Sequence, residues 1–204
     1  MQTDRLSDHD GPKYSYPIYL FGKLFAKITG WRVTGQVPNY SKMVIIAAPH
    51  TTNWDFVYLL MAACVFRLKI HWMGKESLFG PPFGTFMRSL GGIAIARDRR
   101  TNVVFQLAEE LRKQDRLAIV IPPAGTRRKT DYWKSGFYWI AREAKVPVVC
   151  GYLDYEKREA GLGLSFIPSG DASVDMERLR NFYGDKVAKY PHRLSRIRLR
   201  EEDE

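Results

Sequence analysis

The sequence A-A-P-H-T-T-N-W-D-F, residues 47–56, joins a strand-like run to a helix-like run. Residues 43–48 form a short apolar run, as in a buried strand, and residues 53–66 continue as an apolar stretch that suits a buried helix. A strand that leads through a short turn into a helix is a building unit of α/β proteins. This stretch therefore predicts an α/β fold. It also places His50 at the end of a strand, five residues before Asp55.

The same alternation of short β-rich runs and helical patterns extends along the whole chain. The predicted strands are residues 32–37, 43–48, 69–73, 93–96, 117–121, 147–153 and 164–167. The predicted helices are residues 17–29, 53–66, 102–114, 132–144 and 173–189. This order indicates helices packed on a largely buried sheet. We expect a single domain over residues 1–204, with a polar arm at 1–16 and a polar tail at 190–204, whose last four residues are expected to be disordered.

Residues 17–31 predict an amphipathic helix near the N-terminus. Its apolar and basic positions follow helical spacing: Ile18, Phe21, Phe25 and Ile28 recur, and Lys23 and Lys27 lie four residues apart on one face. Such a helix can lie at the interface of an anionic membrane. It can equally cover the core of the protein, and the sequence leaves both interpretations open.

The charge balance favours anionic partners. The 204 residues include 32 basic and 22 acidic side chains, which gives a net charge of +10. Phospholipid surfaces, nucleic acids and phosphorylated small molecules all suit such a chain. Nucleic acid is the least supported, because the sequence contains neither zinc-ligand spacing nor the aromatic block of an RNA-recognition motif. We therefore expect no nucleic-acid partner and favour an anionic membrane surface.

The location of the protein is predicted from three features. The N-terminal residues lack the apolar core of a signal peptide. The longest apolar run, residues 56–66, is shorter than the roughly 20 residues that span a bilayer. The two cysteines, Cys64 and Cys150, lie in apolar segments, which favours a reducing compartment. We expect a peripheral protein at the cytoplasmic face of the membrane, and the sequence gives no prediction of its oligomeric state.

His50 and Asp55 admit two interpretations. Thr52 and Asp55 match the spacing of a capping box, in which a side chain satisfies free N–H groups at the start of a helix. Alternatively, Asp55 in the first helical turn can hold one imidazole nitrogen of His50 and leave the other to deprotonate a hydroxyl. The sequence contains no G-x-S-x-G motif that would supply a serine nucleophile, so the hydroxyl would belong to the substrate.

Two basic segments follow other predicted strands. L-G-G-I-A-I-A-R-D-R-R, residues 90–100, places cations just before a predicted helix, and P-P-A-G-T-R-R-K, residues 122–129, combines a glycine turn with three cations. An anion bound at the start of a helix would offset the conflict between these cations and the helix dipole. Each segment alone could be a solvated loop. Ligands of α/β proteins bind at the carboxyl ends of strands, so the three strand ends together predict a binding site.

Four short blocks occur along the chain in a fixed order: H-x4-D at His50 and Asp55, G-I-x-I-x-R at residues 92–97, P-x-G-T-R at residues 123–127, and V-P-V at residues 146–148. Their order resembles that of the glycerolipid acyltransferases, in particular the group that contains the 1-acylglycerol-3-phosphate acyltransferases. The resemblance extends over roughly residues 17 to 170.

The resemblance implies a mixed, mostly parallel sheet flanked by helices, with an N-terminal amphipathic segment that faces the membrane. It implies acyl transfer from an acyl thioester, either acyl-CoA or acyl-carrier protein, to the hydroxyl of a lysophospholipid such as 1-acylglycerol-3-phosphate. It implies neither a metal nor a cofactor besides the donor. The roles that it implies are these: His50 is the general base, Asp55 its partner, Arg97 and Arg127 bind the acceptor phosphate, and Gly125 and Thr126 shape the site. Lys75 is a further candidate phosphate ligand, or else a solvent-exposed lysine.

The chain departs from the family pattern at two positions. Pro49 precedes the histidine where family members usually carry Asn, and Ala124 stands where the third block usually carries Glu. The missing carboxylate motivates an alternative function, that of a lipid-binding relative with weakened catalysis. The family pattern also predicts that Ala124→Glu would raise the transfer rate.

Overall fold

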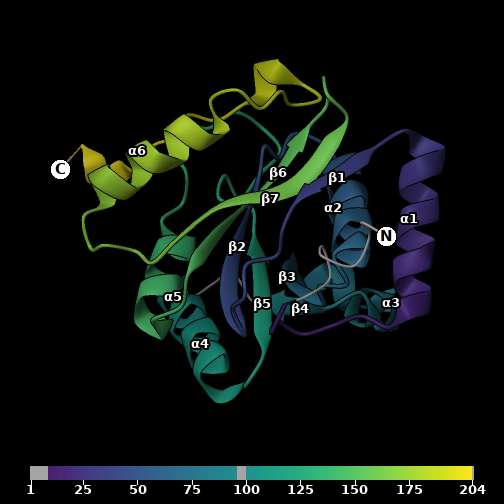
Figure 1. The fold of residues 1–204 in the computed structure, drawn as a ribbon. Coiled ribbons are helices and arrows are strands. Elements are labelled where there is room, and N and C mark those ends of the chain that lie inside the picture. Colours follow the sequence, from purple (N-terminus) through teal and green to yellow (C-terminus); the bar gives the residue numbers. More distant parts are fainter. Residues whose placement is uncertain (1–8, 96–99, 204) are drawn as a thin grey trace.

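A computed structural model of the chain describes residues 9–95 and 100–203. It contains seven strands in one sheet (Figure 1). The strands are β1 (Arg32–Gly35), β2 (Lys42–Ala48), β3 (Ile70–Lys75), β4 (Gly92–Ile95), β5 (Leu117–Ile121), β6 (Val148–Asp154) and β7 (Glu159–Phe166). The α-helices are α1 (Tyr16–Thr29), α2 (Trp54–Val65), α3 (Gly84–Ser89), α4 (Arg100–Lys113), α5 (Gly136–Ala144) and α6 (Ala172–Tyr183).

The sheet is mixed and mostly parallel, as predicted. Its strand order is β1-β7-β6-β2-β5-β3-β4, so β2 lies at the centre. The five strands from β6 to β4 in this order run parallel, whereas β7 pairs antiparallel with β6 and β1 runs parallel to β7. The carboxyl ends of the five parallel strands therefore meet at one edge, where the three functional segments predicted from the sequence begin.

Side chains of β2 alternate between two hydrophobic cores, one on each face of the sheet. Val44 and Ile46 pack with residues of α4, α5 and α6, whereas Met43 and Ile45 pack with residues of α1 and α2. Figure 1 shows α1 and α2 on one side of the strands and α4 and α5 on the other. Because both faces are covered, the central strands consist of continuous apolar runs.

Helix α1 attaches to the domain through one aromatic and two small residues. Its buried residues are Tyr19, Gly22 and Ala26, and a Cβ atom at Gly22 would lie only 2.6 Å from the Cβ of Cys64 in α2. The large apolar residues that the sequence analysis assigned to one face mostly point outward: Ile18, Phe21 and Ile28 are exposed, and Phe25 is half-buried. Helix α1 thus covers part of the core through Tyr19, Gly22 and Ala26, while most of the predicted apolar residues point away from the domain. Its binding to a membrane stays a prediction. Within the described residues, no helix has both the length and the apolar character needed to cross a bilayer.

The C-terminal region differs most from the prediction. Helix α6 ends at Tyr183 rather than at residue 189, and the residues after it fold back along the domain (Figure 1). Leu199 is buried, and 3₁₀ turns form at Pro191–Arg193 and Arg200–Glu202. Trp133 donates a backbone hydrogen bond to Arg198, which delays the start of α5 to Gly136. The expected polar tail at 190–204 is thus wrong for its described part: apolar Leu199 anchors it.

The short helix α3 and the 3₁₀ turn at Glu76–Phe79 were not predicted. They occupy a segment rich in glycine and proline, which masks helical periodicity. Phe79 from this turn is buried against the α2 side of the sheet.

Candidate active site

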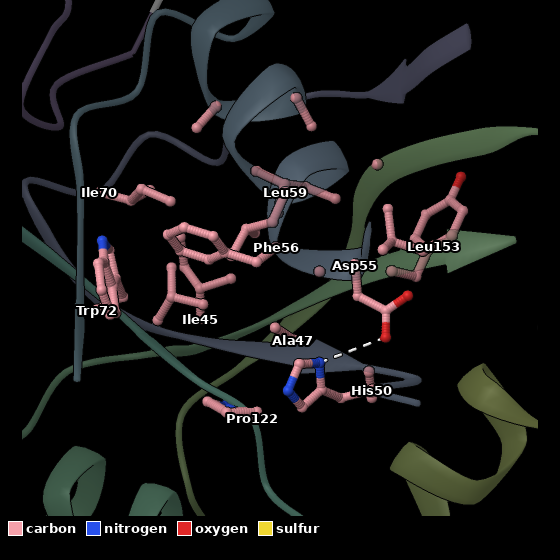
Figure 2. A pocket seen from close by; sticks show the side chains of 18 of the residues that line it. Ile45, Ala47, His50, Asp55, Phe56, Leu59, Ile70, Trp72, Pro122 and Leu153 are labelled. Atoms are coloured by element: carbon pink, nitrogen blue, oxygen red, sulfur yellow. Dashed lines mark ion pairs between the residues drawn. The ribbon is translucent and has the colours of Figure 1, made fainter. Parts of the chain in front are cut away.

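His50 lies just beyond the carboxyl end of the central strand β2. The chain leaves β2 through the cis peptide bond between Ala48 and Pro49 and enters α2 at Trp54. The imidazole Nδ1 of His50 lies 3.4 Å from Oδ2 of Asp55, and the two side chains are 20% and 4% exposed. Figure 2 shows Nδ1 directed at Asp55, with the other ring nitrogen turned away from it toward Pro122. The structure therefore brings the two predicted catalytic residues together.

Asp55 also holds the turn that carries His50. Its Oδ2 accepts hydrogen bonds from the backbone N–H groups of Thr51 (2.6 Å) and Thr52 (2.9 Å). The N-cap of α2 is Asn53 rather than Thr52, so the bond to the Thr52 N–H holds the turn just before the helix and the predicted capping box does not form. The Thr52 hydroxyl instead accepts a 3.4 Å hydrogen bond from the N–H of Trp54. A structural role in this turn and a catalytic role beside His50 are therefore compatible, because one carboxylate serves both.

Tyr155 completes the set of hydrogen bonds around Asp55, and the sequence analysis did not identify it. Its hydroxyl donates a 2.6 Å hydrogen bond to Oδ1 of Asp55. Tyr155 follows directly after β6, which lies beside β2 in the sheet. Its position at another strand end was the available signal, but a tyrosine outside the four sequence blocks carries no motif of its own.

These contacts set the protonation of the network. Burial acts to raise the pKa of the Asp55 carboxyl, but hydrogen bonds from His50, Tyr155 and two backbone N–H groups outweigh it and lower that pKa below its ordinary value. Burial and the bond to Asp55 raise the pKa of the Tyr155 phenol well above its ordinary value. At neutral pH, Asp55 is therefore an anion that orients His50, and Tyr155 remains a hydrogen-bond donor.

An apolar cavity of about 120 Å³ opens next to His50, between α2 and the sheet. Apolar side chains from α2 and the strands form most of its wall, among them Ile45, Phe56, Leu59, Ile70, Trp72 and Leu153. Figure 2 shows His50 at one end of this space and Trp72 and Ile70 toward the other. A wall of this composition suits an alkyl chain, because the hydrophobic effect favours its transfer from water.

A second cavity, of about 180 Å³, lies on the other side of His50. It shares Ala47, Ala48, Pro49 and His50 with the first cavity. The rest of its wall comes from Thr51, from Pro123 and Ala124 in the turn after β5, from Trp133 ahead of α5, and from residues within 183–197. Ala124, the position of the missing family carboxylate, is buried in this wall. His50 thus borders two cavities of different composition.

Among the predicted substrate-binding residues, Lys75, Gly125, Thr126 and Arg127 lie at or just after the carboxyl ends of β3 and β5, and none of these four lines either cavity. Lys75 ends β3 and is exposed. Gly125 has φ +63° in the turn after β5, a conformation that favours glycine, and Thr126 and Arg127 follow it, with Arg127 exposed. Arg97 lies outside the described residues. The roles of these residues as phosphate ligands stay predictions.

Neither cysteine lines the two cavities. Burial raises the pKa of the Cys150 thiol to about 12, and the partly buried Cys64 contacts α1. A thiol that stays protonated is a poor nucleophile. The geometry therefore favours deprotonation of a substrate group by His50 over attack by a cysteine.

Comparisons with known proteins agree with this geometry. A family model described as "Acyltransferase" matches residues 31–153, which include β1 to β5 and most of β6. The chain is 31% identical over 117 residues to a 1-acyl-sn-glycerol-3-phosphate acyltransferase of Streptococcus pneumoniae R6. The aligned part is 57% of this chain but only 43% of that relative.

A solved structure shares the fold. The crystal structure of the 1-acyl-sn-glycerophosphate (LPA) acyltransferase PlsC from Thermotoga maritima superposes with a TM-score of 0.56 at 19% sequence identity. The match covers 83% of this chain and 74% of that one. With a family model that spans more than half of its residues, and with His50 and Asp55 in contact at the end of the central strand, the chain belongs to the acyltransferase family.

Proposed function

We propose that the protein transfers a fatty acyl group from an acyl thioester, either acyl-CoA or acyl-carrier protein, to the free hydroxyl of a lysophospholipid such as 1-acylglycerol-3-phosphate. The observation that carries this proposal is the contact between His50 Nδ1 and the buried carboxylate of Asp55 at the mouth of an apolar cavity. The identity to a 1-acyl-sn-glycerol-3-phosphate acyltransferase supports the choice of acceptor.

In the proposed reaction, Nε2 of His50 accepts the proton of the acceptor hydroxyl as its oxygen attacks the thioester carbonyl. A tetrahedral intermediate forms with the new C–O bond, and it collapses by breaking the C–S bond. The proton held by His50 then passes to the thiolate, so the products are an ester and a free thiol. The Asp55 carboxylate stabilises the imidazolium while His50 holds the proton.

The two substrates would occupy different surroundings. The acyl chain fits the apolar cavity under α2, whose wall offers few polar groups. The acceptor phosphate would meet the cations at the strand ends, and we keep Arg97, Arg127 and Lys75 as its proposed ligands. We expect the reaction to need neither a metal nor a cofactor, since the carbonyl of a thioester is already activated.

We propose that the protein works at the cytoplasmic face of an anionic membrane, where it binds peripherally through α1. The outward face of α1 exposes large apolar side chains, of which Phe21 is 66% and Ile28 is 74% exposed. Lys23 and Lys27 are exposed on the same helix. Apolar residues flanked by lysines suit the interface of a membrane that contains anionic lipids. This arrangement would present the active site to a lipid acceptor without a spanning segment.

Ala124 supports a second candidate function, that of a lipid-binding relative with weakened catalysis. Family members usually carry a glutamate at this position, and here a methyl group faces the second cavity. If that carboxylate is required for turnover, the protein would bind lysolipid and transfer little.

One experiment tests both functions. The purified chain is incubated with 1-acylglycerol-3-phosphate and either acyl-CoA or acyl-carrier protein, and the diacyl product is quantified by mass spectrometry. We expect transfer that falls about 10²–10⁴-fold in the folded His50→Ala variant. Equal product from the wild type and His50→Ala would reject the general-base assignment. Lysolipid binding without His50-dependent product would favour the weakened relative.

A further inference from the structure

The second cavity beside His50 is built in part from residues that follow the family match. Tyr183, Gly184, Lys186 and residues 193–195 and 197 line it, together with Pro123, Ala124 and Trp133. All of the first group lie beyond residue 153, where the family model ends. Its volume of about 180 Å³ far exceeds the roughly 10–15 Å³ that suffices for one water molecule. The cavity therefore has room for a small polar group next to the proposed base.

The charges that line this cavity are positive. Lys186 and Arg193 belong to its wall, and none of the described residues that line it is an aspartate or glutamate. Lys186 contacts Asp185, but that carboxylate is 62% exposed, so solvent screens it. Among the described residues, no carboxylate forms an ion pair with Arg193, whose guanidinium lies 4.7 Å from the centroid of the Tyr190 ring. The cavity thus offers two cations to an anion.

Ala124 fits the same interpretation. A glutamate at this position would add a carboxylate to the wall that Lys186 and Arg193 also line, and would neutralise part of their charge. With alanine, which is 7% exposed, the wall adds only a methyl group. The loss of the family carboxylate therefore leaves the cavity more attractive to a bound anion.

The C-terminal segment is fixed to the catalytic turn. The N–H of Tyr190 donates to the Thr51 hydroxyl at 3.4 Å, and the Arg193 guanidinium donates to the Thr51 carbonyl at the same distance. Thr51 adjoins His50 and itself donates to Asp55. Farther along the segment, Ser195 accepts hydrogen bonds from the backbone N–H and the hydroxyl of Thr130. These bonds hold Arg193 beside Thr51, the residue next to the proposed base His50.

We propose that this second cavity binds a phosphate group through Lys186 and Arg193, and that the phosphate is that of the lysophospholipid acceptor, as an alternative to its ligation by Arg97, Arg127 and Lys75 at the strand ends. The proposal rests on the proposed acyltransferase function. The acyl chain of the donor would lie in the apolar cavity on one side of His50, and the head group of the acceptor in the basic cavity on the other side. The hydroxyl to be acylated, which is linked to the phosphate through the glycerol, then meets the thioester at His50 between the two.

The first test measures binding without turnover. In the His50→Ala background, isothermal titration in detergent compares 1-acylglycerol-3-phosphate with 1-acylglycerol, which lacks the phosphate. We expect the phosphate-bearing lipid to bind more tightly. Its affinity should fall roughly 10- to 100-fold in Arg193→Gln and in Lys186→Met, because each loses a charge-assisted hydrogen bond. The affinity for 1-acylglycerol should stay unchanged.

Arg196→Gln is the matched control, because Arg196 is an exposed cation of the same segment that does not line the cavity. It should leave the affinity unchanged. Arg193→Lys, which keeps the charge, should restore part of the affinity lost in Arg193→Gln. Ala124→Glu should weaken binding of the phosphate-bearing lipid and spare 1-acylglycerol. Thermal unfolding of each variant shows whether the fold is intact.

The second test uses turnover and separates the two sources of phosphate. In proteins that retain His50, Arg193→Gln and Lys186→Met should raise KM for the acceptor and leave KM for acyl-CoA unchanged. A rise in KM for acyl-CoA alone would assign the cavity to the donor and overturn the proposal. Unchanged affinity and unchanged KM in both variants, with His50-dependent transfer intact, would also overturn it and leave the acyltransferase function standing. Phosphate-specific binding without any transfer would support the cavity and reject that function.

Discussion

The two faces of the central sheet carry different chemistry around one histidine. On the α2 face, His50 borders a cavity with an apolar wall. Helix α1 packs on α2 on the same side of the sheet and exposes large apolar side chains to the outside. On the α5 and α6 face, His50 borders a cavity with two cations and a C-terminal segment fixed by hydrogen bonds. The difference indicates how such a fold can serve a reaction between an apolar and a charged reactant. The end of β2 holds the proposed base, the apolar cavity suits the apolar reactant, and the basic cavity suits the charged one.

The largest expected effect is on kcat and concerns Asp55, which contacts His50, the residue that borders both cavities. Asp55→Asn should lower kcat about 10²–10⁴-fold, because a carboxamide can neither stabilise the imidazolium nor hold the correct tautomer of His50. The measurement is steady-state kinetics with both substrates varied. If the melting temperature falls but kcat is unchanged, Asp55 acts only to hold the turn before α2, and the proposed catalytic role of the His50–Asp55 pair is wrong.

The outer surface of the α2 face can be tested next. The double variant Lys23→Gln/Lys27→Gln should bind anionic vesicles about 30-fold more weakly at low salt, because each lysine near the surface contributes about 1 kcal/mol. Vesicle sedimentation is the measurement. Lys113→Gln/Lys145→Gln, which removes two exposed lysines from the α4 and α5 side, is the control and should bind like the wild type. Equal losses in both pairs would mean that net charge, rather than this face, drives binding.

The apolar cavity should set the length of the acyl chain. Leu59→Trp enlarges a side chain in its wall and should lower kcat/KM about tenfold for long acyl-CoA donors, since overpacking costs about 1–3 kcal/mol. Short donors serve as the internal control and should react at the wild-type rate. A uniform loss over all chain lengths would argue that the acyl chain lies elsewhere.

Tyr155→Phe should produce a smaller loss, of roughly threefold to tenfold in kcat, with little change in KM. The variant keeps the ring but removes the hydroxyl that donates to Oδ1 of Asp55, so the carboxylate loses one of the groups that orient it. Tyr190→Phe is a suitable control, because within the described residues the Tyr190 hydroxyl makes no hydrogen bond to Asp55. An unchanged kcat in Tyr155→Phe would limit the role of this hydroxyl to packing.

The smallest expected effect is on stability at acid pH. The pKa of Asp55 in the folded protein is below its ordinary value of 3.8, so its ionised form stabilises the fold above that pH. This contribution is lost as the pH falls from about 3.8 through the lower, folded-state value. Urea unfolding across this range should show a shallower pH dependence in Asp55→Asn than in the wild type. Identical slopes would contradict the effect of the hydrogen bonds on Asp55.

The sequence predicted the parts of the fold that depend on local pattern. Six of the seven strands lie close to their predicted places, whereas β7 begins at Glu159, five residues before the predicted strand at 164–167. His50 and Asp55 are in contact, because a fixed strand–turn–helix connection carries both. Tyr155 was missed because it reaches Asp55 from a position 100 residues later in the chain. The packing of the C-terminal segment was missed because most of its residues are polar or charged, and the single buried Leu199 forms no apolar pattern in the sequence. Long-range contacts between polar residues leave no periodic pattern.

The close approach of Gly22 to Cys64 has a consequence for how the enzyme would sit on a bilayer. Because Gly22 lets α1 approach the Cys64 side chain of α2 this closely, with Tyr19 and Ala26 also buried, turning the apolar face of α1 into the domain would break this packing. The same α2 begins beside Asp55. A membrane that binds α1 would therefore hold α2, and with it the Asp55 carboxylate, at a constant height and tilt. The packing of α1 on α2, rather than the fluid lipid, would then fix the distance between the membrane and Asp55. That distance is how far a lipid acceptor has to move out of the bilayer.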